Sequence, residues 1–137
     1  MIDQLNHKYA SDRIRFIHHD LTRDAIPKCD LVINRDCLFH FSYSDILRFF
    51  SKFLESEAKF LLTTSHDNLI NFSNSDIITG DFRLLDLFAE PFAFPMDFLF
   101  KVPEPGGVDL PSRGVILWNR DQVIHSFKNL GSYLSGL

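Results

Sequence analysis

Three consecutive polar residues, Asn34-Arg35-Asp36, directly follow the short apolar run Leu31–Ile33. The run is typical of a buried strand, and the polar residues mark its carboxyl end. In open α/β sheets, ligands bind outside the carboxyl ends of the strands, so an amide, a guanidinium and a carboxylate here could hold a ligand. His40 adds an imidazole that could accept a proton. Polar tips are also common on solvated strand ends, and the pattern leaves both interpretations open.

The elements that must position these residues can be read from the flanking sequence. Ser42-Tyr43-Ser44-Asp45 is a helix-start signal, and the pattern predicts an amphipathic helix over 44–55. Its apolar residues, which we expect to face inward, are Ile46, Leu47, Phe49, Phe50 and Phe53. A second strand is predicted over 59–65, and Thr64-Ser65-His66 at its end falls on the same ligand side of the sheet. Strand, polar tip and helix together form half of a βαβ unit.

Two stretches of the chain resemble one protein family. The sequence from Asp30 to Phe41 is similar to the fourth-strand motif of class I S-adenosylmethionine-dependent methyltransferases, in which an acidic residue, an apolar strand, a polar tip and a Leu-x-His-Phe-like turn precede a helix. Some bacterial-type members also carry a motif like Asn74–Leu87, Asn-Ser-Asp-Ile-Ile-Thr-Gly-Asp-Phe-Arg-Leu-Leu-Asp-Leu, before a Pro-Phe pair such as Pro91-Phe92. The resemblance extends from Met1 to about Arg120.

The resemblance implies a site for the cofactor S-adenosylmethionine. Asp20 stands where the family has an acidic residue that accepts a hydrogen bond from the adenine amine, and Leu21 would lie beside the ring. Asn34 at the strand tip would complete the cofactor contacts. An Asp after a strand is also a common turn residue, so a turn remains the alternative for Asp20.

The same resemblance implies roles on the side of the methyl acceptor, which the sequence does not identify beyond a small molecule or a protein side chain. Asp36 and His40 are the candidate catalytic residues, although a histidine in the position of His40 more often orients the turn than abstracts a proton. Arg35, Asp81 and Arg83 are candidates for substrate binding. Asp81 and Arg83 flank Phe82, so the two charges could share one face, or Asp81 could cap a turn while Arg83 is solvated.

The predicted fold class is α/β, a partial Rossmann-like methyltransferase sheet that ends in an antiparallel hairpin. We treat the chain as one partial domain with four regions: βα units over 1–66, an acceptor-side loop region over 67–97, a terminal hairpin over 98–120, and a C-terminal helix within 121–137. The predicted strands are 14–18, 30–34, 59–65, 98–102 and 114–119, with a turn over 103–107 and a first helix over 2–10. The apolar residues of the loop region favour packing over disorder.

The glycine-rich cofactor loop of the family has no counterpart in the chain, and neither have the first two strands. The family's strand order is 3-2-1-4-5-7-6, so strand 14–18 would have no neighbour and one edge of strand 30–34 would lie bare. Unpaired strand edges favour self-association. The chain is therefore expected to be an excerpt, an incomplete gene product, or a protein that borrows a partner. Methyl transfer and a catalytically inactive or regulatory methyltransferase-like subunit both remain open.

Composition narrows the function classes further. With 137 residues and a net charge of −4, the chain gives no electrostatic support for binding nucleic acid or anionic membranes. Cys29 and Cys37 are predicted to be free thiols of a cytoplasmic protein. No zinc-ligand spacing, nucleophile elbow, phosphate loop, signal peptide or membrane-spanning run is present, so we expect no metal.

Overall fold

The computed structural model describes residues 1–67, 69–106 and 108–136. Asn68, Gly107 and Leu137, which belong to the predicted loop region, turn and C-terminal region, lie outside the described residues. The described elements, in chain order, are α1 (Ile2–Tyr9), β1 (Leu31–Asn34), a 3₁₀ turn η1 (Leu38–His40), α2 (Tyr43–Glu55), β2 (Phe60–His66), β3 (Phe100–Glu104), β4 (Arg113–Asn119) and α3 (Arg120–Ser135).

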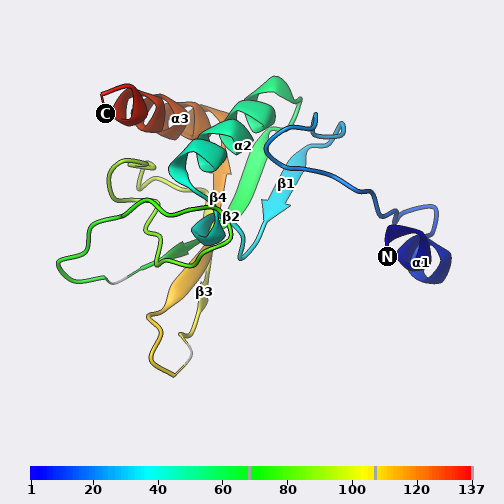
Figure 1. Cartoon of the computed structure of the whole chain (residues 1–137), viewed down its shortest axis with the longest axis horizontal. Helices are drawn as coiled ribbons and strands as arrows, with labels where there is room; N and C mark the ends of the chain where they lie inside the picture. Colours follow the sequence, from blue (N-terminus) through cyan, green and yellow to red (C-terminus); the bar gives the residue numbers. More distant parts are fainter. Residues whose placement is uncertain (68, 107, 137) are drawn as a thin grey trace.

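The four strands form one mixed sheet in the order β1-β2-β4-β3 (Figure 1). β1 and β2 are parallel, whereas β4 is antiparallel to both β2 and β3. The expected antiparallel arrangement of the last two strands is therefore confirmed. Because β4 alone runs in the opposite direction, the carboxyl ends of β1, β2 and β3 meet the start of β4 at one edge of the sheet.

α2 and α3 contact each other and pack on the same face of the sheet. The sheet residues on this face, Val32, Leu61, Ile116 and Trp118, join one core with the helices. The predicted inward face of α2 is largely confirmed, with four of its five apolar residues fully buried: Ile46, Phe49, Phe50 and Phe53. Both helices begin with a side-chain cap, Ser42 on α2 and an Asn119–Gln122 capping box on α3.

The opposite face of the sheet exposes apolar side chains on its two outer strands, β1 and β3. Leu31 and Ile33 of β1 are 40% and 62% exposed, and Phe100 and Val102 of β3 are 55% and 43% exposed. The register places Ile33 beside Leu62, and both Leu62 and Phe100 beside Leu117, so an apolar row crosses all four strands. Exposed apolar patches of this kind mark contact surfaces or association liabilities.

The predicted strand over 14–18 is wrong. Only an isolated bridge between Ser11 and Ile14 occurs there, and Ile14 and Ile17 are exposed. A strand needs a neighbour for its backbone hydrogen bonds, and this segment has none. α1 has no buried residue and lies apart from the sheet (Figure 1).

The terminal hairpin is confirmed, with a shift along the chain. β3 ends at Glu104 rather than at residue 102, so it includes Pro103, which was predicted to begin the turn. An edge strand tolerates proline, because its outer N–H positions have no ladder partner to lose. In the region 67–97, the described residues form neither helix nor strand, yet Leu85, Leu87, Phe92 and Phe94 are buried.

Candidate functional site

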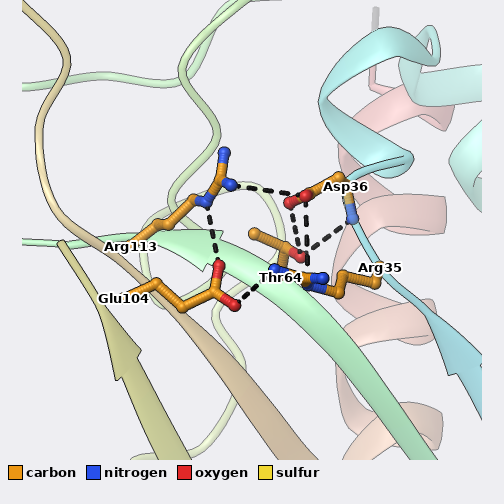
Figure 2. Close-up of polar contacts among 5 residues, drawn as sticks. All are labelled: Arg35, Asp36, Thr64, Glu104 and Arg113. Atoms are coloured by element: carbon orange, nitrogen blue, oxygen red, sulfur yellow. Dashed lines mark hydrogen bonds and ion pairs between the residues drawn. The ribbon is translucent and has the colours of Figure 1, made fainter. Parts of the chain in front are cut away.

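A network of charged side chains lies where the strands end (Figure 2). We call Arg35, Asp36, Thr64, Glu104 and Arg113 the strand-end network. The carboxylate of Asp36 accepts hydrogen bonds from the Thr64 hydroxyl at 3.2 Å and from Nη2 of Arg113 at 3.3 Å. Glu104 accepts from Nε of Arg113 at 3.1 Å and from Nη2 of Arg35 at 2.6 Å. The network therefore links the tip of β1 to β2, β3 and β4.

Asp36 adopts a left-handed backbone conformation with φ of 53°. This region is costly for most residues but is tolerated by Asp and Asn. The Thr64 hydroxyl accepts a hydrogen bond from the Asp36 amide at 2.9 Å, which fixes the turned-back tip over the sheet. The conformation thus brings the Asp36 carboxylate to β4 instead of leaving it in solvent.

The four charges of the strand-end network cancel in pairs. Asp36 and Glu104 offset Arg35 and Arg113, and the side chains remain between 21% and 55% exposed. Ion pairs at this exposure contribute little stability each, although a closed network fixes geometry better than isolated pairs. We conclude that the network orients the tip of β1 more than it stabilises the fold.

Asn34 does not join the strand-end network. Its side chain is 4% exposed, and its amide atoms have no nitrogen or oxygen partner among the described residues. Burial raises the pKa of the nearby Cys37 thiol. Thr63, the register partner of Asn34, is also buried without a hydroxyl partner in the described part of the chain. Two buried polar side chains, Asn34 and Thr63, therefore lie next to the partly exposed strand-end network at the tip of β1.

The two stretches that carry the family resemblance contact each other directly. Nδ1 of His40 lies 2.8 Å from the carbonyl oxygen of Asp81, and the Gly80 amide donates to the His40 carbonyl at 2.8 Å. The His40 ring also contacts the rings of Phe39 and Phe82. His40 therefore has one ring nitrogen occupied by the backbone, consistent with the orienting role that the sequence left open.

Arg83 is buried, whereas Asp81 is exposed. Nη1 of Arg83 donates to the Phe41 carbonyl at 2.6 Å, and the guanidinium lies 5.2 Å from the centre of the Tyr43 ring. Burial lowers the pKa of Arg83. A shared face for the charges of Asp81 and Arg83 and a solvated Arg83 are thus both wrong, because Arg83 turns inward to the carbonyl of Phe41, directly after η1.

Other polar residues of the second stretch hold the loop region in place. Asp76 accepts from the Tyr43 amide at 2.7 Å, at the first residue of α2, and Thr79 accepts from the Ser42 amide at 2.9 Å. Asn74 donates to the Asp86 carbonyl at 2.7 Å and accepts from the Asp86 amide at 3.0 Å. These contacts give the motif a structural function at the start of α2.

Asp20 forms a turn with its own neighbours. Its carboxylate accepts from the Thr22 amide at 2.9 Å and from the Thr22 hydroxyl at 2.8 Å, which lowers its pKa. Leu21 packs against the edge of the core. Among the described residues, no hydrogen bond or ion pair joins Asp20 to the tip of β1, so the two halves of the predicted cofactor site are not linked directly.

Two residues outside the predicted cofactor, catalytic and substrate-binding sets, His66 and Arg113, face one pocket. They are register partners in β2 and β4, so their side chains project from the same face of the sheet. The pocket has a volume of about 190 Å³ and is lined by His66, Pro105, Gly106, Leu110, Pro111 and Arg113; we call it the hairpin pocket. The position of His66 at a strand end was a usable signal, whereas nothing local in the sequence marks Arg113.

His66 is 2% exposed, and burial lowers its pKa from the ordinary value of 6.5. The nearby Arg113 charge lowers it further, while a hydrogen bond with the Leu85 backbone and the charges of Asp36 and Asp67 act in the opposite direction. Its Nδ1 lies 3.1 Å from the Leu85 amide nitrogen, which can donate to it. The ring is consequently neutral near pH 7, and its Nε2 has no hydrogen-bond partner among the residues that the structure describes.

Within the described residues, no group of three His, Cys, Asp or Glu side chains is placed to hold a metal ion. None of the described helices has the length and apolar character needed to cross a membrane. Comparison of the sequence with protein-family models finds no matching family, and comparison with curated proteins finds no match.

Proposed function

We propose that this chain supplies the second half of a class I methyltransferase sheet and takes part in methyl transfer from S-adenosylmethionine. The strand order carries the proposal. β1-β2-β4-β3, with β4 antiparallel to its neighbours, has the arrangement expected for strands 4-5-7-6 of that family. The polar tip of β1 then stands at the edge where ligands bind in such sheets.

The residues present fit one side of a cofactor site. The Asp20 carboxylate is about half exposed and can accept a further hydrogen bond besides those from Thr22. Asn34 is buried and would support the tip rather than touch the ligand. S-adenosylmethionine, when bound, supplies an electrophilic methyl group. The chain's own contribution is to align that group with an acceptor, and alignment provides much of the rate in such displacements.

On the acceptor side, the chain offers positioning rather than strong acid–base chemistry. Asp36 is held by Thr64 and Arg113, so its carboxylate has a defined place at the edge. Arg35 is the most exposed member of the strand-end network, and a ligand that binds its guanidinium would compete with Glu104, which Nη2 of Arg35 contacts at 2.6 Å. His40 and Asp81 hold the turn after β1 against the loop region, because the His40 ring is bonded to the Asp81 backbone.

Titration of the ¹⁵N-labelled chain with S-adenosylhomocysteine tests the proposal. We expect saturable shifts at Asp20, Leu21 and the 34–36 tip. Asp20→Ala should weaken this binding because it removes the acceptor for the adenine amine, whereas Asp81→Ala should leave it unchanged. Equal weakening in both variants would show that the acceptor side is misplaced. No saturable shift at either segment would remove the support for methyl transfer by this chain.

A second candidate is a catalytically inactive methyltransferase-like subunit that completes its sheet with another chain. The bare edge of β1 favours it, because Leu31 and Ile33 lie exposed on a strand with a neighbour on one side only among the described strands. The same titration separates the candidates, since an inactive subunit need not bind the cofactor at all.

A further inference from the structure

We propose that the hairpin pocket binds a carboxylate group, held between His66 and Arg113. Neither residue belongs to the cofactor or acceptor residues expected from the sequence. That the carboxylate belongs to the methyl acceptor rests on the function proposed above, whereas carboxylate binding itself does not.

His66 presents a hydrogen-bond donor to the hairpin pocket. Its Nδ1 lies 3.1 Å from the Leu85 amide nitrogen and 3.3 Å from the Leu85 carbonyl oxygen. That carbonyl already accepts from the His66 amide at 2.8 Å, so the geometry favours the tautomer in which Nδ1 accepts from the Leu85 amide and the proton of the neutral ring is on Nε2. The Phe39 ring, 5.3 Å away between centres, packs against the imidazole and restricts its rotation. Because the ring is otherwise buried, the hairpin pocket is where Nε2–H can reach a ligand.

Arg113 presents a second donor that is already oriented. Its Nε is bonded to Glu104 and its Nη2 to Asp36, which fixes the plane of the guanidinium. The remaining nitrogen, Nη1, has no partner among the described residues and carries no contact line in Figure 2. Charge-assisted hydrogen bonds from a fixed guanidinium are among the stronger contacts for a carboxylate.

The rest of the hairpin pocket offers no competing acidic side chain. Its other lining residues are Pro105, Gly106, Leu110 and Pro111. The carboxylates of Asp36 and Glu104, which contact Arg113, also pair with Arg35, so the four charges of the strand-end network balance before a ligand enters. Two donors and no acidic side chain in the lining select an oxygen acceptor, and the arginine favours one that carries negative charge.

The hairpin pocket also adjoins the tip of β1. Arg113 lines the pocket and is bonded to Asp36 at 3.3 Å. A carboxylate held by Arg113 would therefore be connected through this one side chain to the tip of β1, where we propose that the cofactor binds. A volume of about 190 Å³ accommodates a carboxylate and a few attached atoms rather than a large molecule. The acceptor class that fits is therefore a small carboxylic acid or an acidic side chain.

Acetate tests the pocket directly, with acetamide as its neutral isostere. We expect acetate to give saturable NMR shifts at Gly106, Leu110 and Arg113, with an affinity about tenfold higher than that of acetamide. Equal binding of the two compounds, or shifts that do not saturate in this region, would overturn the proposal. This comparison uses the wild-type chain and does not depend on any variant folding.

Two arginine variants sharpen the result. Arg113→Gln should weaken acetate binding by about tenfold, whereas Arg35→Gln, which removes a charge from the same network but does not line the pocket, should change it by less than about twofold. Equal losses would show a general charge effect instead of a pocket. The acetate titration contains no S-adenosylhomocysteine, so the two proposals are tested separately. Acetate binding without binding of S-adenosylhomocysteine would contradict the proposed function alone. Binding of S-adenosylhomocysteine without acetate binding would contradict the pocket alone.

Discussion

Nδ1 of His40 and the carbonyl oxygen of Asp81 lie 2.8 Å apart, although 41 positions separate the two residues in the sequence. The contact joins the turn after β1 to the loop region, and the Arg83 amide adds a second link by donating to the Phe39 carbonyl at 3.1 Å. Two stretches that the sequence singled out separately are thus one structural unit. The conformation of the β1 tip and the start of α2 depends on both.

The first prediction concerns the start of α2. Asp76→Ala removes the carboxylate that accepts from the first amide of the helix, and we expect a loss of about 1 kcal/mol in the free energy of unfolding. Urea denaturation measures it. Asp81→Ala is the control, because that side chain is exposed, and it should change stability by less than about 0.5 kcal/mol. A stable Asp76→Ala protein would show that Ser42 suffices as the cap.

The second prediction compares two adjacent threonines. Thr64→Val removes the acceptor of the Asp36 amide and one of the donors to the Asp36 carboxylate, which keeps Arg113, so it should cost about 1–3 kcal/mol of unfolding free energy. Thr63→Val removes a buried hydroxyl that has no partner in the described part of the chain, so it should be neutral or stabilising. Chemical denaturation of both variants checks the order. Similar losses would mean that Thr64 does not fix the tip.

The third prediction concerns pH. His66 has a lowered pKa in the folded protein, so below its ordinary value of 6.5 the unfolded chain binds more protons. The stabilisation is complete above pH 6.5 and is lost as the pH falls towards the folded pKa. The urea concentration at the unfolding midpoint should therefore decrease as the pH is lowered from about 7.5 to about 5.5, the range in which histidines titrate.

Histidine variants attribute this pH effect. His66→Gln should flatten the decrease, whereas His125→Gln, at an exposed position of α3, should retain it. Identical pH profiles for His66→Gln and the wild type would assign the effect to another group.

The fourth prediction concerns the open face of the sheet. Ile33→Lys should reduce self-association in sedimentation velocity runs over a range of concentrations, because it places a charge on the edge strand where Ile33 is 62% exposed. Ile70→Lys removes an isoleucine that is 89% exposed but lies outside the sheet, and it should have no such effect. Equal effects would indicate non-specific association of apolar surface.

Periodicity was sufficient to predict α2, α3 and the strands β1, β2 and β4 to within about two residues. Each of these segments pairs or packs within the described fold, so the local pattern and the tertiary environment agree. Residues 14–18 have an equally good strand pattern and fail, because a strand also requires a partner that no local pattern reveals. The family resemblance implied that this segment would lack a neighbouring strand, but its local pattern still led us to predict a strand.

The candidate site was predictable only in part. Asp36 was identified because strand ends are visible in the sequence, yet its partners Glu104 and Arg113 were not. They lie 68 and 77 positions further along the chain, and their approach to Asp36 follows from the sheet order rather than from any spacing. The burial of Arg83 was missed for a similar reason, since its acceptor is a backbone carbonyl that could belong to any residue.

The strand-end network has a consequence for how this edge of the molecule opens. Its side chains come from the ends of β1 and β3, the body of β2 and the start of β4, so no strand end can separate without breaking a contact to another strand. Amide protons at these four places should therefore exchange with solvent as one cooperative unit, with a shared opening free energy. The separate α1 segment, which has no buried residue, should exchange independently and much faster.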